Sequence, residues 1–281
     1  MIEKIYIPTI RRANKQITYE KLPQELKDRV VMVIESKEKH EYNYPCEYLE
    51  IPEEFVGQWT QLAQTRKFIH QNAGKTKYAM FDDDIVFYKR NSKYFNGISN
   101  METSKRESTH EEIFHMFDTA SKWLDEQDIG IVGLSKNYLP PGDVEYSDTK
   151  DVYSCIFLDG KKIYTIVDKV DTSIRVAEDL LFLFDCISNG INTRRSNEFL
   201  YFNKSETKEF QNCRPIWNDM FNDSPKNVFE TKEHYEALEY IRNKYPNGIT
   251  FFQENGVTKH KKHLKDVYKP LSQSSLDNFF V

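Results

Sequence analysis

Residues 77–87 decide the fold: they read KYAMF at positions 77–81, DDD at positions 82–84 and IVF at positions 85–87. The apolar residues on both sides are typical of buried strands. Three adjacent carboxylates at the end of a buried strand repel one another and are poorly solvated unless a cation takes up their charge. Mg²⁺ and Mn²⁺ bind a few carboxylates and keep coordination positions for substrate phosphates. The run therefore indicates a divalent metal site, with a solvated acidic turn as the alternative.

The composition is that of an ordered globular chain. Its 281 residues include 19 Phe and 17 Tyr but only 10 Gly and 10 Pro, unlike a disordered protein. The net charge of −5 does not by itself indicate a nucleic-acid partner. No stretch approaches the ~18 apolar residues of a membrane span, and the first residues, MIEKIYIP, contain no signal-peptide core. We therefore expect a cytoplasmic protein, in the host cytoplasm if it is viral, with reduced core thiols at Cys46, Cys155, Cys186 and Cys213.

Strand and helix patterns alternate through the first half of the chain. This alternation predicts an α/β fold with a mixed, mostly parallel sheet flanked by helices. Ligands of such sheets bind at the carboxyl ends of the strands, where Asp82 to Asp84 would emerge. The expected elements are strands at 4–7, 30–34, 77–80 and 129–133 and helices at 59–73 and 111–126.

The second half is more mixed. No internal repeat and no long Pro, Gly or Ser linker divides the chain, so we expect a single domain. The expected elements are a hairpin of 156–158 and 163–167 with Asp159-Gly160 at its turn, helices at 178–188 and 232–244 and a strand at 199–202.

Three parts follow one another in a characteristic order: a loop after the first strand, an arginine in a helix, and an Asp-x-Asp run at the end of a strand. This order resembles the A-type fold of nucleotide-sugar glycosyltransferases. The resemblance implies one glycosyltransferase A-type domain over 1–281, with a nucleotide-sugar donor half at 1–133 and an acceptor half at 134–281. It implies a donor site at Pro8, Thr9, Arg11, Arg66, Asp82 and Asp83, and Mn²⁺ or Mg²⁺ held by Asp82 and Asp84.

The family's second acidic motif resembles Val176-Ala177-Glu178-Asp179, which opens an apolar helix. The resemblance implies that Asp179, with Glu178 beside it, serves as the base that removes the acceptor proton. Acidic residues are also favoured in any first helical turn, because the exposed amides and the helix dipole attract them. The family's C-terminal histidine ligand of the metal would correspond to His260 or His263, and polar surface in a lysine-rich tail is the alternative.

The resemblance implies transfer of a sugar, most simply from a UDP-sugar, with Arg11 or Arg66 contacting the diphosphate. Inverting and retaining mechanisms both stay open. In size and motif order the chain also resembles bacteriophage glycosyltransferases that modify hydroxymethylated pyrimidines in DNA. DNA is then the expected acceptor, and no membrane partner is expected. Candidate contacts are the basic residues 259–269 and Arg194-Arg195 for phosphates, and Tyr138, Trp217 or Phe221 for a flipped base.

Other functions are compatible with the same sequence. A cytoplasmic glycosyltransferase could act on a saccharide, a protein or a small molecule. A sugar nucleotidyltransferase would need a glycine-rich loop after the first strand, and Pro8-Thr9-Ile10-Arg11 contains no glycine. A metal-dependent nuclease would use the same aspartates without a nucleotide sugar. A DNA-binding module without activity would tolerate loss of all three aspartates.

Overall fold

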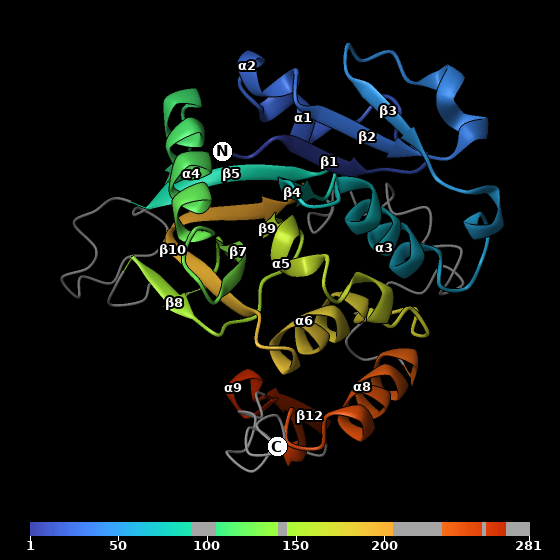
Figure 1. Cartoon of the computed structure of the whole chain (residues 1–281), viewed down its shortest axis with the longest axis vertical. Helices are drawn as coiled ribbons and strands as arrows, with labels where there is room; N and C mark the ends of the chain where they lie inside the picture. The colour runs from blue at the N-terminus through green and yellow to red at the C-terminus, as the bar shows by residue number, and fades with distance from the viewer. Residues whose placement is uncertain (91–104, 140–144, 205–231, 255–256, 268–281) are drawn as a thin grey trace, which may run out of the picture.

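The computed structural model describes residues 1–90, 105–139, 145–204, 232–254 and 257–267. One large sheet forms the centre of the molecule (Figure 1). A short strand, β8 (Tyr146–Asp148), pairs with β10 (Asn192–Asn203) outside the main order of strands. That order is β3 (Glu47–Glu50), β2 (Val30–Ile34), β1 (Lys4–Pro8), β4 (Lys77–Phe81), β9 (Cys155–Asp159), β7 (Ile129–Lys136), β10 (Asn192–Asn203), β5 (Ile85–Arg90) and β6 (Lys105–Glu107).

The sheet is mixed and mostly parallel, which confirms the expected fold class. Strands β3, β2, β1 and β4 are parallel neighbours, and so are β7 and β10. Strand β9 runs antiparallel between β4 and β7, and β5 runs antiparallel to β10. Strands β4 and β5 therefore leave the aspartate turn in different parts of the sheet.

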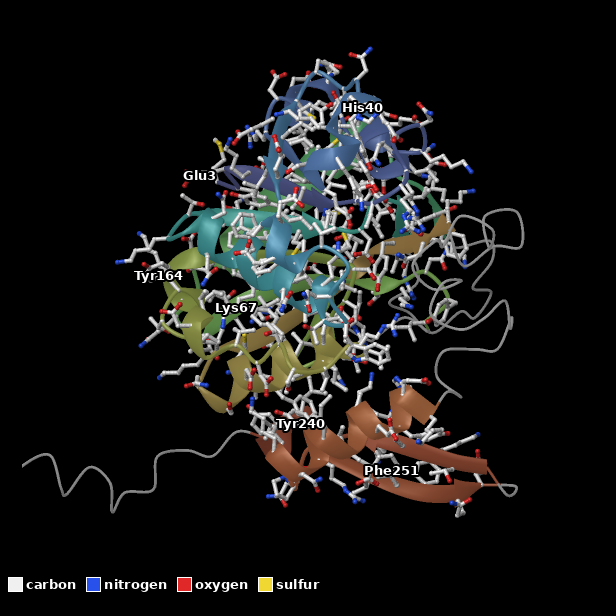
Figure 2. The ribbon with its side chains drawn as sticks, turned by 90° about the vertical axis from the view of Figure 1, so that its right-hand side faces the viewer. Glu3, His40, Lys67, Tyr164, Tyr240 and Phe251 are labelled. Atoms are coloured by element: carbon white, nitrogen blue, oxygen red, sulfur yellow. The ribbon has the colours of Figure 1, made fainter. Side chains whose placement is uncertain are left out.

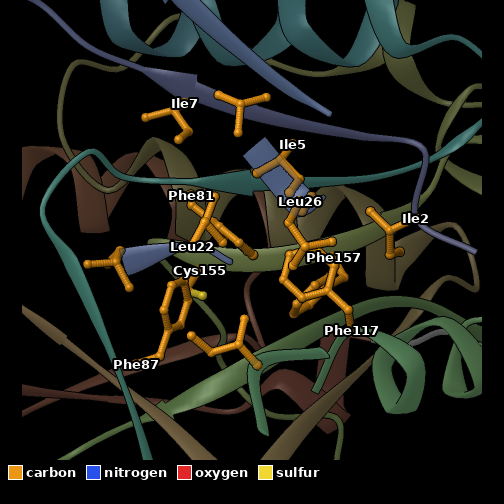
Figure 3. Packing of buried hydrophobic residues seen from close by; sticks show 14 of the residues in the cluster. Ile2, Ile5, Ile7, Leu22, Leu26, Phe81, Phe87, Phe117, Cys155 and Phe157 are labelled. Atoms are coloured by element: carbon orange, nitrogen blue, oxygen red, sulfur yellow. The ribbon is translucent and has the colours of Figure 1, made fainter. Parts of the chain in front are cut away.

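Helices cover both faces of the sheet. Apolar side chains of α1 (Ile17–Lys21), α2 (Gln24–Lys27) and α4 (His110–Trp123) pack on one face, where Phe81, Phe117 and Phe157 meet (Figure 3). The other face carries α3 (Gln61–Ala73), α5 (Gly160–Ile163) and α6 (Glu178–Ser188). Short 3-10 helices lie at η1 (Ser36–Glu41), η2 (Glu53–Phe55) and η4 (Val167–Lys169).

A C-terminal group of elements packs on the outer side of α6 (Figure 1). A third apolar cluster joins them, with Leu181 and Phe184 of α6 against Leu238 and Ile241. At this junction the Tyr240 hydroxyl donates a hydrogen bond of 2.7 Å to Asp171 (Figure 2). The group consists of α8 (Lys232–Lys244), β11 (Ile249–Glu254), β12 (Val257–Lys262) and α9 (Leu264–Val267).

Most expected elements are confirmed. The strand at 30–34 and the helices at 178–188 and 232–244 have the expected bounds. The strand expected at 199–202 is part of the longer β10, and the helix expected from residue 59 begins at Gln61.

The hairpin expected around Asp159-Gly160 is wrong. Residues 155–159 form β9, but the chain then enters α5, because the Asp159 carboxylate accepts a hydrogen bond of 3.0 Å from the Lys161 amide and caps the helix. Gly160 is needed for close packing, since a Cβ there would lie 2.2 Å from the Thr76 carbonyl oxygen. The Asp-Gly pair therefore starts a helix and does not close a hairpin.

The cysteine expectation holds within the described residues: Cys155 and Cys186 are buried, Cys46 is half-buried, and all three are free thiols. Cys213 lies outside the described residues. No helix in the described ranges has both the length and the apolar character that a membrane crossing requires.

Helix α1 holds the aspartate turn in place. The Thr18 amide donates to the Asp83 carbonyl at 3.0 Å. The Thr18 hydroxyl donates to the Asp82 carbonyl and accepts a bond of 2.8 Å from the Ile85 amide. One buried threonine thus satisfies both backbone groups that flank the carboxylates.

We expect Thr18→Val to lower the free energy of unfolding by about 1–3 kcal/mol, because it leaves the Asp82 carbonyl and the Ile85 amide buried without a partner. Urea unfolding measures the change. Thr165→Val is the control, since this exposed hydroxyl donates to a carbonyl in the same way. Equal effects of the two substitutions would contradict a role for Thr18 in holding the turn.

Candidate functional site

Asp83 points into the protein. Its Oδ2 accepts a hydrogen bond of 2.7 Å from the Thr9 hydroxyl, and its Oδ1 forms an ion pair with Arg12. The Thr9 hydroxyl in turn accepts a bond of 2.8 Å from Gln16. Burial raises the pKa of Asp83 to about 6, and the nearby charge of Asp84 adds to this, while Arg12 and Thr9 oppose it. Thr9 and Asp83 therefore tie the loop after β1 to the aspartate turn.

Asp82 points the other way, toward helix α3. Its Oδ1 lies 3.4 Å from Nη2 of Arg66, and Nε of Arg66 lies 3.3 Å from Oε1 of Glu178. The Arg66 side chain is only 14% exposed, and its charge is paired with both carboxylates. The structure thus brings together Arg66 from α3, Asp82 from the turn after β4 and Glu178 from the start of α6. The first and the last of these residues are 112 positions apart in the sequence.

A narrow pocket lies beside this ion-pair cluster. Arg66, Glu178 and Asp179 line it, together with Tyr153 and His70. Burial raises the pKa of Glu178 to about 7, and the charge of Asp179 acts in the same direction. The Asp179 Oδ1 accepts a bond of 2.8 Å from the amide of the next residue in α6. Asp179 is less buried than Glu178, so its carboxylate is the one available to a ligand.

The start of α6 is locally strained. Ala177 has φ of 57°, a left-handed conformation that residues with a Cβ rarely adopt. The next two residues are Glu178 and Asp179, in the first turn of the helix, where the dipole favours negative charge. Backbone strain of this kind persists only where surrounding contacts hold it in place, and it is often found at functional sites.

Asp82 and Asp84 are the residues that fit a divalent ion. Asp84 is 5% exposed and accepts a bond of 3.0 Å from Asn203, and its charge acts on Asp82. Mg²⁺ is commonly held by one or two carboxylates together with substrate phosphates. In the described part of the chain no three His, Cys, Asp or Glu side chains are grouped to hold an ion. The donor set therefore fits an ion shared with a diphosphate and not one enclosed by protein ligands.

The two candidate histidines lie on the C-terminal elements. Nε2 of His263 lies 2.9 Å from the Thr250 hydroxyl, and its Nδ1 lies 3.7 Å from Asp266. The His260 ring lies 5.6 Å from the ring of His234. Among the described residues, neither histidine forms a metal-binding group with the aspartates.

The remaining donor candidates lie at the end of β1. Pro8 closes the strand, and Arg11 follows with φ of 53°. The Arg11 amide donates a bond of 2.7 Å to Glu38. The Arg11 side chain is exposed at the carboxyl end of the strand, the edge at which the sequence predicts the ligand.

The arginine pair in β10 is engaged within the fold. Arg194 is 4% exposed and makes a bidentate ion pair with Asp148, at 2.6 and 3.0 Å, and a further pair with Glu126. Arg195 contacts Asp151 at 3.1 Å. These arginines stabilise the packing of β8 against β10, and the expectation that Arg194 contacts phosphates is wrong.

The aromatic candidates are only partly described. Tyr138 is 51% exposed, with the Lys136 amine 5.6 Å from its ring centre. Trp217 and Phe221 lie outside the described residues.

Several residues of the site were missed from the sequence. Arg12 directly follows the expected Arg11, but nothing local distinguishes which of the two pairs with Asp83. His70 lies one turn after Arg66, is stacked on Phe182 at 4.4 Å and contacts the Tyr78 hydroxyl at 2.6 Å. Burial lowers the pKa of His70 to about 3, so it is a neutral wall of the pocket. The signal in the sequence that could have identified His70 was its position on the apolar face of α3.

We expect the stability of the metal-free protein to fall as the pH rises from about 4.5 to about 7. Glu178 has a folded-state pKa above its unfolded value, so the folded protein binds its proton more tightly in this range. Glu178→Gln removes the contribution of Glu178 and makes the fall smaller, while the contribution of Asp83, whose pKa is also raised, remains. Urea unfolding in a chelator at several pH values measures it, and a variant with the same pH dependence as the natural chain would contradict the assignment.

Comparison with known proteins identifies a family. Residues 3–211, most of the chain, match the family described as TET-Associated Glycosyltransferase. A search of curated protein sequences finds no match. Similar solved structures include S. aureus TarS 1–349, with 13% identity, coverage of 94% of this chain and 97% of that chain, and a TM-score of 0.43. Another is UTP-bound UGPase from Acinetobacter baumannii, with 10% identity, coverage of 85% and 99%, and a TM-score of 0.39.

Proposed function

The chain belongs to the TET-associated glycosyltransferase family, and on this premise we propose that it moves a sugar from a UDP-sugar to an acceptor hydroxyl at the pocket beside Arg66. The observation that carries the proposal is the ion-pair cluster of Asp82, Arg66 and Glu178, with Asp179 beside it in the pocket wall. One glycosyltransferase domain supplies both sides of this site, with Asp82 from the donor half and Asp179 from the acceptor half.

Asp179 is the proposed general base. It takes the proton from the acceptor hydroxyl while the hydroxyl oxygen forms a bond to the anomeric carbon and the bond from that carbon to the diphosphate breaks. Attack on the face opposite the diphosphate inverts the anomeric configuration. Asp179 suits this role because it lines the pocket and is less buried than its neighbour Glu178.

Arg66 positions the carboxylates. Although burial opposes its charge, Glu178, Asp82 and Asp179 together raise the pKa of Arg66, so the guanidinium stays protonated. It forms ion pairs with both Asp82 and Glu178 beside the pocket. When bound, a divalent ion at Asp82 and Asp84 neutralises the charge of the leaving diphosphate. The Arg11 side chain lies at the same edge of the sheet for contact with phosphate oxygens.

The acceptor that we favour is the hydroxymethyl group of a modified pyrimidine in phage DNA. The supporting contact is between Tyr153, which lines the pocket, and Lys262, which belongs to the strand with the lysine-rich sequence. A lysine-rich surface next to the pocket suits a polyanionic acceptor.

Transfer of label from UDP-sugars to duplex DNA tests donor, metal and acceptor together. We expect label in DNA that contains 5-hydroxymethylpyrimidines and none in unmodified DNA. A chelator should abolish transfer, and so should Asp84→Asn, which removes a ligand charge at constant size. Label in a saccharide, a protein or a small molecule, with none in either DNA, would contradict the DNA acceptor. Cleavage of the DNA without transfer would indicate a nuclease instead.

Asp179→Asn should lower kcat by about 10²–10⁴-fold, because a general base acts in the transition state. The dissociation constant of the UDP-sugar should change little, since the base contacts the acceptor. Rapid-quench transfer assays and calorimetric titration of the donor measure the two quantities. Asp118→Asn, at an exposed position of α4, is the matched control. An equal loss of donor affinity and turnover would assign Asp179 to donor binding.

A further inference from the structure

A second, open hollow of about 550 Å³ lies on the side of the molecule formed by the C-terminal elements. One wall is β12 and the start of α9, and the opposite wall is the segment 149–151 before β9. We call it the basic cleft. Its basic lining residues are Lys150, His260, Lys261, Lys262, His263 and Lys265.

Most of the positive charge in the basic cleft is not neutralised by nearby carboxylates. Among the described residues, Lys150, Lys261 and Lys265 are exposed and form no ion pair. The two carboxylates of the cleft are already engaged, Asp151 with Lys262 and Asp266 with His263. Three lysines held around one hollow without counter-charge favour the binding of a ligand with several negative charges.

Both walls are held firmly. The backbone of Lys150 is fixed by Thr193, whose hydroxyl accepts from its amide at 3.0 Å and donates to its carbonyl at 2.6 Å. On the other wall, the Tyr235 hydroxyl of α8 donates a bond of 2.6 Å to the Thr258 carbonyl. The lysines therefore project from preorganised backbone, which reduces the entropy lost on binding.

A thin layer of side chains separates the basic cleft from the pocket. Lys262 donates a hydrogen bond of 2.6 Å to the Tyr153 hydroxyl and lies 3.3 Å from Asp151. Asp151 is also held by Arg195 at 3.1 Å. Tyr153 lines the pocket, whereas Asp151 and Lys262 line the cleft. A chain bound in the cleft therefore lies next to the pocket that contains Asp179.

We propose that the basic cleft binds the phosphodiester backbone of the acceptor strand, with Lys150, Lys261 and Lys265 contacting its phosphates. This inference rests on the proposed function in that the acceptor is DNA. Lysine amines act as point charges on phosphate oxygens and carry no sequence information, so the cleft orients the strand and does not select the base. Lys262 contributes to the wall and not to phosphate binding, because its amine is held by Tyr153 and Asp151.

The test is the triple variant Lys150→Gln, Lys261→Gln and Lys265→Gln in the full chain. Its affinity for hydroxymethylated duplex DNA should fall at least tenfold at low salt. The slope of log K against log salt should become shallower by about 2–3, since each lost phosphate contact removes about 0.9 of slope. Hydrolysis of the UDP-sugar without acceptor should be unchanged. The control is the triple variant Lys122→Gln, Lys161→Gln and Lys169→Gln, at exposed positions outside the cleft. It has the same net charge as the cleft variant.

The outcomes separate the two proposals. A loss of affinity and slope in the cleft variant, with neither in the control, supports the cleft. If the natural chain glycosylates DNA and the cleft variant binds DNA like the control, the cleft proposal fails and the proposed function stands. If the natural chain glycosylates only a saccharide and does not bind DNA, the DNA acceptor and the cleft both fail.

Discussion

The buried guanidinium of Arg66 is the contact on which the site depends. It joins helix α3 to the turn after β4 through Asp82 and to the start of α6 through Glu178. A buried charge is tolerated only when it is paired, and here one arginine compensates two carboxylates from distant parts of the chain. This pairing joins α3, the aspartate turn and the start of α6 beside the pocket. The left-handed Ala177 is held next to it, where the chain must turn to present Asp179.

The three adjacent aspartates have different roles because their side chains diverge. Asp83 is turned inward to Thr9 and Arg12 and anchors the loop after β1. Asp82 points to Arg66, and Asp84 is held by Asn203. With Glu178 and Asp179 nearby, the carboxylates outnumber the two guanidinium groups, and the divalent ion of the proposed function would neutralise this excess of negative charge.

Local signals in the sequence predicted the elements well and long-range contacts poorly. The apolar run of β2 and the helical periodicity of α6 and α8 are local, so their bounds were found. The Asp159-Gly160 pair is compatible with a turn or a helix cap, and only the contact of Gly160 with Thr76 decides between them. The aspartate run was conspicuous in the sequence. Which aspartate pairs with which arginine was not, because Arg12 is 71 positions from Asp83 and Arg66 is 16 positions from Asp82. Likewise, the sequence does not reveal that Arg194 is neutralised by Asp148.

The basic cleft carries an excess of positive charge, whereas the pocket beside Arg66 is lined by charges of both signs. The pocket therefore attracts a polyanionic backbone less than the cleft does, and under the proposed function the phosphates of the acceptor lie in the cleft. The basic cleft offers them lysines on the other side of Tyr153. At the boundary, Asp151 is held between Lys262 and Arg195, which together compensate its charge. A negative net charge for the whole chain is therefore compatible with a nucleic-acid acceptor, because local charge and not the total determines where a strand lies.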